Sequence, residues 1–269
     1  MKCTCSFLTN FVGMNRYIIH LAYNGTNYHG WQRQPGSVTV QELVEKCLSH
    51  LVEKGITVVG AGRTDTGVHA SEFYAHFETN HIFNSVEEAR NLVYKMNRYL
   101  PYDIAIKNLY RAHPEFHARF SATAREYQYF IKRIKDPFST EFALDIYGSL
   151  DVKSMNRASG ILLEYEDFSC FSRSNTQTKT NNCNITRAEW RECESDLIFT
   201  IEANRFLRNM VRAVVGTLLD VGKGKLIPED IHRIIQSKDR GNAGTSAAAK
   251  GLFLTKVEYP EGYIIPFTD

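Results

Sequence analysis

A single carboxylate on a glycine-rich stretch is the most distinctive chemical feature of the sequence. Asp65 lies within Gly60-Ala-Gly-Arg-Thr-Asp-Thr-Gly-Val-His-Ala70, with Arg63 before it and His69 after it. The three glycines permit backbone angles that other residues avoid and let a ligand approach the chain closely. A nearby positive charge favours the ionised form of a carboxylate. An ionised aspartate on a tight turn suits a nucleophile or a base better than a proton donor.

Three other motifs share parts of this stretch, and each lacks an essential element. Asp65-Thr66-Gly67 is the tripeptide of aspartic proteases, which need a second carboxylate to share a proton, and Arg63 opposes such sharing. Gly60-x-Gly62 could open a dinucleotide-binding turn, but Asp65 stands where the third glycine belongs. The Gly-Lys-Ser/Thr of a phosphate-binding P-loop is missing from this stretch. An ordinary Asp-x-Gly turn is the remaining alternative, and the flanking glycines and arginine disfavour it.

A second stretch carries three arginines at helical spacing. Arg205, Arg208 and Arg212 are three and four residues apart, so a helix that begins near residue 205 would carry them roughly along one face. The opposite face would be the apolar stripe of Met210, Val211, Val214, Val215, Leu218 and Leu219. Most charge runs are simply solvated faces. Here no acid lies among the arginines, which favours contact with phosphate or carboxylate groups.

A third stretch mixes basic and aromatic residues. Arginines 111, 119 and 125 alternate with Phe116, Phe120, Tyr127 and Tyr129. This combination fits backbone contact and base stacking on single-stranded nucleic acid. Taken alone the pattern is weak, because tyrosines in a strand more often serve packing. The histidines of the sequence show no convincing metal-ligand spacing, so we expect no metal site.

Composition places the chain among ordinary globular proteins. Of 269 residues, 43% are apolar and 23% charged, which argues against disorder, collagen and a coiled coil. A formal charge of +2 excludes a uniformly basic protein but allows a local basic surface. The six cysteines form no C-x-x-C pair, as expected of reduced thiols in the cytoplasm. Residues 1–15 make a poor signal peptide, and no apolar run approaches the roughly 20 residues of a membrane helix.

Periodicity indicates an α+β fold with mixed, largely antiparallel sheets flanked by helices. The expected strands are 17–23, 57–61, 73–78, 103–110, 126–132, 186–192, 197–203 and 252–259. The expected helices are 40–52, 86–96, 151–163, 210–219 and 228–236, and 172–184 is an expected loop. We expect an N-terminal tail (1–15), an N-terminal half with the Asp loop (16–135) and a similar C-terminal half with the arginine helix (136–269).

The three stretches, in this order, resemble the bacterial tRNA pseudouridine synthase A family. Gly62 to Ala70 resembles its catalytic loop, Phe116 to Tyr129 its Arg-Phe-Ser-Ala and Tyr-x-Tyr segment, and Asn204 to Arg212 its third motif. Tyr23 to Gln32 and Gly251 to Pro260 resemble its opening and closing segments. The resemblance spans about residues 15 to 260 and implies the pseudouridine synthase fold, with the active-site cleft between two halves.

The resemblance also implies a function and roles for individual residues. The activity would be the cofactor-free isomerisation of uridines 38, 39 and 40 in the anticodon stem-loop of tRNA, by a cytoplasmic homodimer. Asp65 would be the nucleophile, Arg212 would orient it, and Arg63 would lie beside the flipped nucleotide. Tyr127 would stack on the target base. The further substrate-binding residues that we expect are His69, Arg119, Arg125, Arg205 and Arg208.

Two other hypotheses remain at this point. One is an inactive tRNA-binding or chaperone-like relative, which the presence of Asp65, Tyr127 and Arg212 disfavours. The other is an aspartic protease, for which the sequence offers only a tripeptide.

Overall fold

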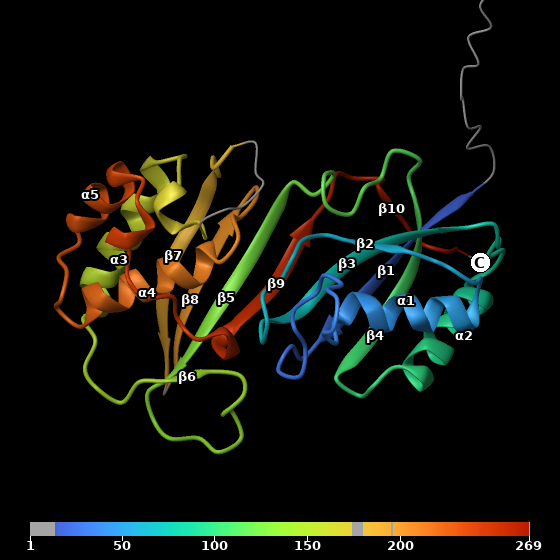
Figure 1. The fold of residues 1–269 in the computed structure, drawn as a ribbon, viewed down its shortest axis with the longest axis horizontal. Coiled ribbons are helices and arrows are strands. Elements are labelled where there is room, and N and C mark those ends of the chain that lie inside the picture. Colours follow the sequence, from blue (N-terminus) through green and yellow to red (C-terminus); the bar gives the residue numbers. More distant parts are fainter. Residues whose placement is uncertain (1–13, 174–179, 195, 269) are drawn as a thin grey trace, which may run out of the picture.

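A computed structural model provides the structure of the chain, and it describes residues 14–173, 180–194 and 196–268. The proposed tail lies almost wholly outside these residues, as does the middle of the expected loop at 172–184. Figure 1 shows an elongated sheet with two groups of helices, one toward each end.

The helices and the longer strands follow the order that sequence periodicity predicts, whereas the two-residue strands at 144–145 and 264–265 were not predicted. The strands are β1 (Asn15–Tyr23), β2 (Val58–Gly60), β3 (His69–Thr79), β4 (Ile104–Ala112), β5 (Ala124–Lys132), β6 (Leu144–Asp145), β7 (Ile185–Cys193), β8 (Asp196–Ala203), β9 (Leu252–Glu258) and β10 (Ile264–Ile265). The helices are α1 (Val40–Leu51), α2 (Val86–Tyr99), α3 (Val152–Ile161), α4 (Met210–Gly222) and α5 (Asp230–Ser237). The short 3-10 turns are Leu162–Glu164, Ser169–Phe171, Arg240–Asn242 and Ala249–Gly251.

Local sequence signals explain where several helices begin. The hydroxyl of Thr39 accepts a hydrogen bond from the backbone N–H of Glu42, and Ser85 does the same for Glu88. Asp151 caps α3 in the same way through Ser154. Such caps satisfy donors that have no partner inside the helix, and each contributes about 1 kcal/mol.

The strands join into one sheet, which is an α+β arrangement of mixed strand direction. Its strand order is β10-β4-β1-β3-β9-β5-β8-β7, with β2 paired to β3 and β6 paired to β5. The β3–β9 and β5–β6 pairs are parallel, and the other strand pairs of the described residues are antiparallel. The sequence led us to expect separate sheets in two halves. Instead the C-terminal strand β9 returns between β3 and β5 and makes the sheet continuous.

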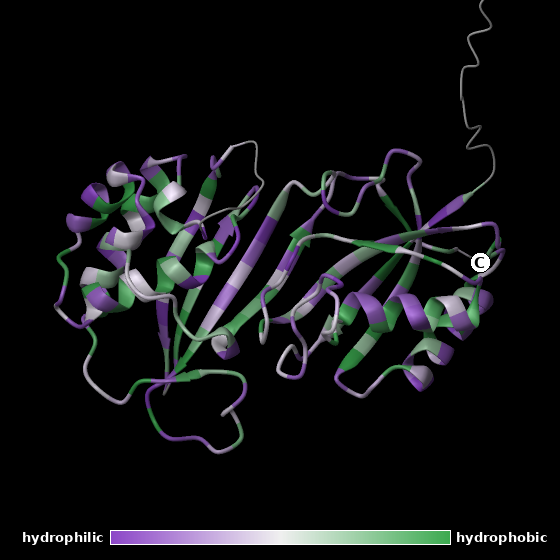
Figure 2. Ribbon diagram, in the orientation of Figure 1, coloured by the Kyte–Doolittle hydropathy of each residue, from purple (hydrophilic) through white to green (hydrophobic). Residues whose placement is uncertain are grey.

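Two large apolar cores lie along this sheet. One packs α1 and α2 against β1, β3 and β4, and the other packs α3, α4 and α5 against β5, β7 and β8. Strands that are half covered alternate hydrophobic and hydrophilic positions, and part of β5 shows this alternation in Figure 2. Strand β5 pairs with β8 and β9 and contributes Tyr129 and Ile131 to the second core. A division into similar halves at residue 135 stays a prediction.

Candidate active site

The Asp65 loop joins β2 to β3 and passes from one core to the other. Ala61, just after β2, belongs to the core of α1 and α2, whereas Val68 belongs to the core of α3, α4 and α5. The backbone N–H of Val68 donates to the carbonyl of Asp65 at 3.1 Å, which closes a tight turn. Gly67 in this turn has φ of 75°, a value that favours glycine. The loop is therefore anchored at both ends, with the aspartate near its middle.

The end of β1 and the segment that follows it hold Thr64, the residue before Asp65, by hydrogen bonds. The Thr64 hydroxyl hydrogen-bonds the Tyr23 hydroxyl at 2.9 Å, and the Thr64 carbonyl accepts from the backbone N–H of Trp31 at 3.3 Å. A Cβ atom at Gly30 would stand 2.2 Å from that carbonyl oxygen. Close backbone approach therefore requires glycine at position 30. The opening motif of the sequence thus supports the Asp65 loop directly.

Asp65 itself points toward an arginine at the surface. Its side chain is 28% exposed, and its Oδ1 lies 3.9 Å from Nε of Arg208, whose side chain is 57% exposed. This distance gives a loose ion pair in contact with water rather than a closed salt bridge. The carboxylate therefore remains accessible to a ligand.

Further arginines gather close to this pair. Burial and the neighbouring charges of Arg63 and Arg205 lower the pKa of Arg119, so these three guanidinium groups lie within electrostatic reach of one another. Arg119 also stacks over the ring of Phe120, which is 76% exposed, at 5.5 Å. Mutual repulsion among arginines favours the binding of an anion between them. The structure thus brings residues of all three sequence stretches together.

Tyr127 lies beneath this cluster, where the two cores meet. Its ring packs against both cores and meets Phe206 edge to face at 5.2 Å. Burial, together with the negative charge of Asp65, raises the pKa of Tyr127 to about 12. The phenol therefore stays protonated at neutral pH and adds no second negative charge beside Asp65.

Arg212 does not adopt the partner that the resemblance implies. Its Nε donates to the carbonyl of Ala247 at 2.7 Å, and among the described residues it forms no ion pair with Asp65. Arg208, which lies 3.9 Å from Asp65, precedes α4, which begins at Met210. The single helical face of three arginines required a helix that begins near residue 205. Arg205 and Arg208 lie before α4, so that arrangement is wrong.

The segment 247–250 is held against the Asp65 loop by three side chains. Besides Arg212, the hydroxyl of Tyr129 donates to the carbonyl of Ala248 at 2.8 Å, and Nε2 of His69 lies 3.1 Å from the carbonyl of Lys250. A Cβ atom at Gly67 would be only 3.4 Å from that of Ala249. Sequence reasoning missed this segment and the part that Tyr129 plays, because nothing in the local pattern links residues so far apart in the chain.

His69 is a buried structural residue in this arrangement. Its ring is 0% exposed, its Nδ1 accepts from the backbone N–H of Gly25 at 3.0 Å, and it stacks on Phe253 at 4.4 Å. Burial lowers the pKa of His69, which favours the neutral ring with its proton on Nε2. A ring enclosed in this way has no surface for a substrate, which counts against our expectation that His69 binds one.

Arg125 is likewise engaged within the protein. Its guanidinium donates to the backbone carbonyls of Ala61, Arg119, Ala122 and Asn204. We expected Arg125 to bind substrate, but in this structure its donors are directed at the chain itself.

Metal binding and membrane crossing are two further properties on which the described residues bear. No group of three or more His, Cys, Asp or Glu in ranges 14–173, 180–194 and 196–268 is arranged to hold a metal ion. Within the same ranges, no helix is both long and apolar enough to cross a membrane.

Comparison with known proteins places these residues in a family. The family model described as tRNA pseudouridine synthase matches residues 165–260, which include Arg205, Arg208, Arg212 and β9. A relative from Bacteroides thetaiotaomicron, named tRNA pseudouridine synthase A, is 50% identical over 92% of this chain and 92% of its own. The proteins of that name from Bacteroides fragilis and Exiguobacterium sibiricum are 48% and 38% identical, over 93% and 92% of this chain and 98% of each relative. The chain therefore belongs to the tRNA pseudouridine synthase A family.

Proposed function

We propose that this protein converts uridine to pseudouridine in tRNA, with Asp65 as the nucleophile. The observation that carries the proposal is one accessible carboxylate, 28% exposed, held on a fastened loop beside arginines. The relatives that share the sequence are named for this activity. In the reaction the glycosidic bond from the ribose carbon to N1 of the base breaks, the base rotates, and the ribose carbon bonds to C5. C5 loses its proton and N1 gains one, so the atoms balance. Product and substrate are isomers, so the overall change needs no oxidant, reductant or second substrate.

The residues around Asp65 have complementary roles in this proposal. Arg63, Arg119, Arg205 and Arg208 contact phosphates of the tRNA, because their charges are not neutralised within the cluster. Tyr127 supplies the aromatic surface on which the target base stacks. Arg212 orients the site through the segment 247–250 rather than by direct pairing with Asp65.

The substrate that we propose is the anticodon stem-loop, at uridines 38, 39 and 40. A uridine that is stacked in a stem must leave the stack before Asp65 can reach it. We further propose that the enzyme acts as a homodimer without a metal or organic cofactor. Activity should persist after exhaustive chelation and dialysis, provided that magnesium needed only for folding of the tRNA is restored in the control.

The decisive experiment maps pseudouridine in unmodified tRNA transcripts after incubation with purified protein. Carbodiimide adducts read by primer extension should appear at positions 38 to 40. Transcripts with cytidine at each of these positions are the matched controls and should lose the corresponding signal. An inactive tRNA-binding relative would bind the transcripts and form no pseudouridine, which would reject the proposal.

A further inference from the structure

Arg125 joins the three sequence stretches that build the candidate site. Two of its hydrogen bonds cross to other parts of the chain, at 3.0 Å to the carbonyl of Ala61 and 2.7 Å to that of Asn204. Ala61 lies four residues before Asp65, and Asn204 directly precedes Arg205. Its other bonds reach the carbonyls of Ala122, at 3.2 Å, and Arg119. One side chain thus fixes the backbone of the Asp65 loop, of Arg119 and of the turn before α4.

The position of Arg125 on β5 adds Tyr127 to this set. Side chains two residues apart on a strand face the same way, so Arg125 and Tyr127 share a face of β5. The guanidinium therefore sets the register between the strand that carries the aromatic surface and the loop that carries Asp65. A planar guanidinium with five donors suits four acceptors on three segments better than an ammonium group with three donors.

The surroundings show that Arg125 does not serve ordinary charge pairing. All four acceptors are carbonyl oxygens, and among the described residues no carboxylate is in ion-pair contact with it. Burial and the charges of Arg119 and Arg205 lower its pKa. A cation in such a place costs free energy unless its donors are satisfied, and here they are satisfied by the backbone.

We propose that Arg125 is a positioning residue, which fixes the Asp65 loop relative to Tyr127 and the phosphate-binding arginines. This inference rests on the proposed function. It assigns Arg125 a role different from direct contact with tRNA, and the two roles predict different measurements. A direct phosphate contact contributes to the salt dependence of binding, whereas a positioning residue contributes to the rate once tRNA is bound.

The test compares Arg125→Lys and Arg125→Met with Arg187→Lys, a control on another strand that lies outside the site. Single-turnover rates at saturating tRNA should fall about 10- to 100-fold in both Arg125 variants, since small misplacements of reacting groups have effects of this size. The slope of log Kd against log salt should match the wild type, even in Arg125→Met. Arg187→Lys should retain rate and slope.

A second readout does not depend on activity. Amide hydrogen exchange should become faster in Arg125→Lys at residues 61–65, 119–122 and 204–208 together, and remain unchanged there in Arg187→Lys. If Arg125→Met fails to fold, the rate and exchange of Arg125→Lys decide the question.

Two results would overturn the inference. One is a wild-type rate at saturation in Arg125→Lys. The other is a full rate in Arg125→Met with a salt slope reduced by about 1, which would identify a phosphate contact. If the wild-type protein itself formed no pseudouridine, the proposed function would fail first, so the two failures are distinguishable.

Discussion

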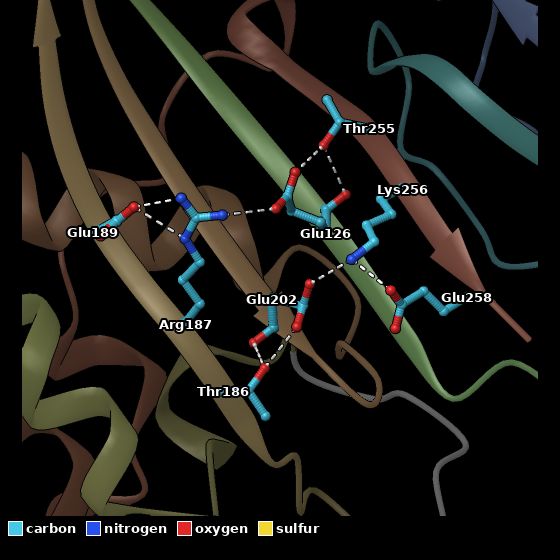
Figure 3. A network of polar contacts seen from close by, with 8 residues as sticks. All are labelled: Glu126, Thr186, Arg187, Glu189, Glu202, Thr255, Lys256 and Glu258. Atoms are coloured by element: carbon cyan, nitrogen blue, oxygen red, sulfur yellow. Dashed lines mark hydrogen bonds and ion pairs between the residues drawn. The ribbon is translucent and has the colours of Figure 1, made fainter.

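Two surfaces of the same sheet both carry basic residues. On the basic surface, beside Asp65, arginines are in excess, whereas on the carboxylate-rich face glutamates surround the basic residues. Beside Asp65, the arginines at 63, 119, 205 and 208 outnumber the carboxylate, and Arg208 is 3.9 Å from it. On the other face of β5, Arg187 and Lys256 are surrounded by Glu126, Glu189, Glu202 and Glu258, as Figure 3 shows.

The carboxylate-rich face is a closed network. Arg187 bridges Glu126 at 3.2 Å and also contacts Glu189, while the Thr255 hydroxyl donates to the other oxygen of Glu126 at 2.9 Å. Lys256 bridges Glu202 at 3.4 Å in the same network. Cationic side chains that are neutralised in this way offer little to a phosphate. Beside Asp65 the arginines outnumber the one carboxylate, so positive charge remains for an anion. The comparison teaches that the balance between cations and carboxylates, rather than the number of arginines, marks a surface suited to phosphate.

The strongest test of the comparison removes the carboxylate of the basic surface. Asp65→Asn keeps the shape and removes the charge, and a neutral amide is a far poorer nucleophile, so turnover should fall below detection. tRNA binding should survive or tighten, because one negative charge leaves the basic surface. Single-turnover formation of pseudouridine and parallel binding assays measure the two effects.

The matched control is Glu202→Gln, an equivalent change on the carboxylate-rich face. It should leave turnover close to that of the wild type. Near-native turnover in Asp65→Asn would show that Asp65 is not the nucleophile.

Arg212→Ala should have the next largest effect. It removes the hydrogen bond to the Ala247 carbonyl and frees the segment that lies against Gly67. We expect the single-turnover rate to fall about 100-fold or more. Arg212→Lys distinguishes charge from geometry. A full rate in that variant would show that a hydrogen bond from arginine is not required.

Much of this arrangement could be predicted from the sequence because local patterns carry it. Thr39 and Ser85 cap the helices that their capping boxes predict, and the alternating strands fall close to their expected bounds. The helix expected at 210–219 begins at Met210, as predicted. Its suggested extension back to residue 205 is wrong, because Asn209 takes a left-handed conformation with φ of 65° directly before α4. The spacing of the arginines gave no sign of this.

The rest depends on contacts between distant parts of the chain. The ring of His69 accepts a hydrogen bond from Gly25 and approaches Lys250, and Arg125 bonds to both Ala61 and Asn204. Sequence motifs identified these residues as functional but could not tell a ligand contact from an internal one. Such contacts arise where strands distant in the sequence pair: β5 with β8 brings Arg125 to Asn204, and β3 with β9 brings His69 to Lys250.

The salt dependence of tRNA binding should differ between variants of the two surfaces, and this effect should be smaller than the losses of rate above. Arg208→Ala should weaken binding several-fold and lower the log–log slope by about 1, because one phosphate contact is lost. Arg187→Ala should leave the slope unchanged, since its partners Glu126 and Glu189 lie on the other face. Filter binding or fluorescence anisotropy across a salt series measures both. Equal slopes for the two variants would contradict the proposal that Arg208 contacts a phosphate of the tRNA and Arg187 does not.

Mild acid should destabilise the folded protein through His69, and this is the smallest effect that we expect. Burial lowers the pKa of His69 below the ordinary value of 6.5, so the folded state resists a proton that the unfolded state accepts. The stabilisation from neutral His69 is therefore complete above about pH 6.5 and declines as the pH falls toward its lowered pKa.

The measurement is the free energy of unfolding from pH 7.5 to 5 for the wild type and for His69→Gln. The wild type should lose stability as the pH falls, and the variant should start less stable and show a shallower dependence, because one titrating group is gone. Other histidines provide an internal check: His76, whose pKa burial lowers to about 4, keeps titrating in both proteins. Glu202→Gln, the matched change on the opposite face, should keep the wild-type slope. Parallel pH curves for the wild type and His69→Gln would show that folding does not change the proton affinity of the ring that links Gly25 to Lys250.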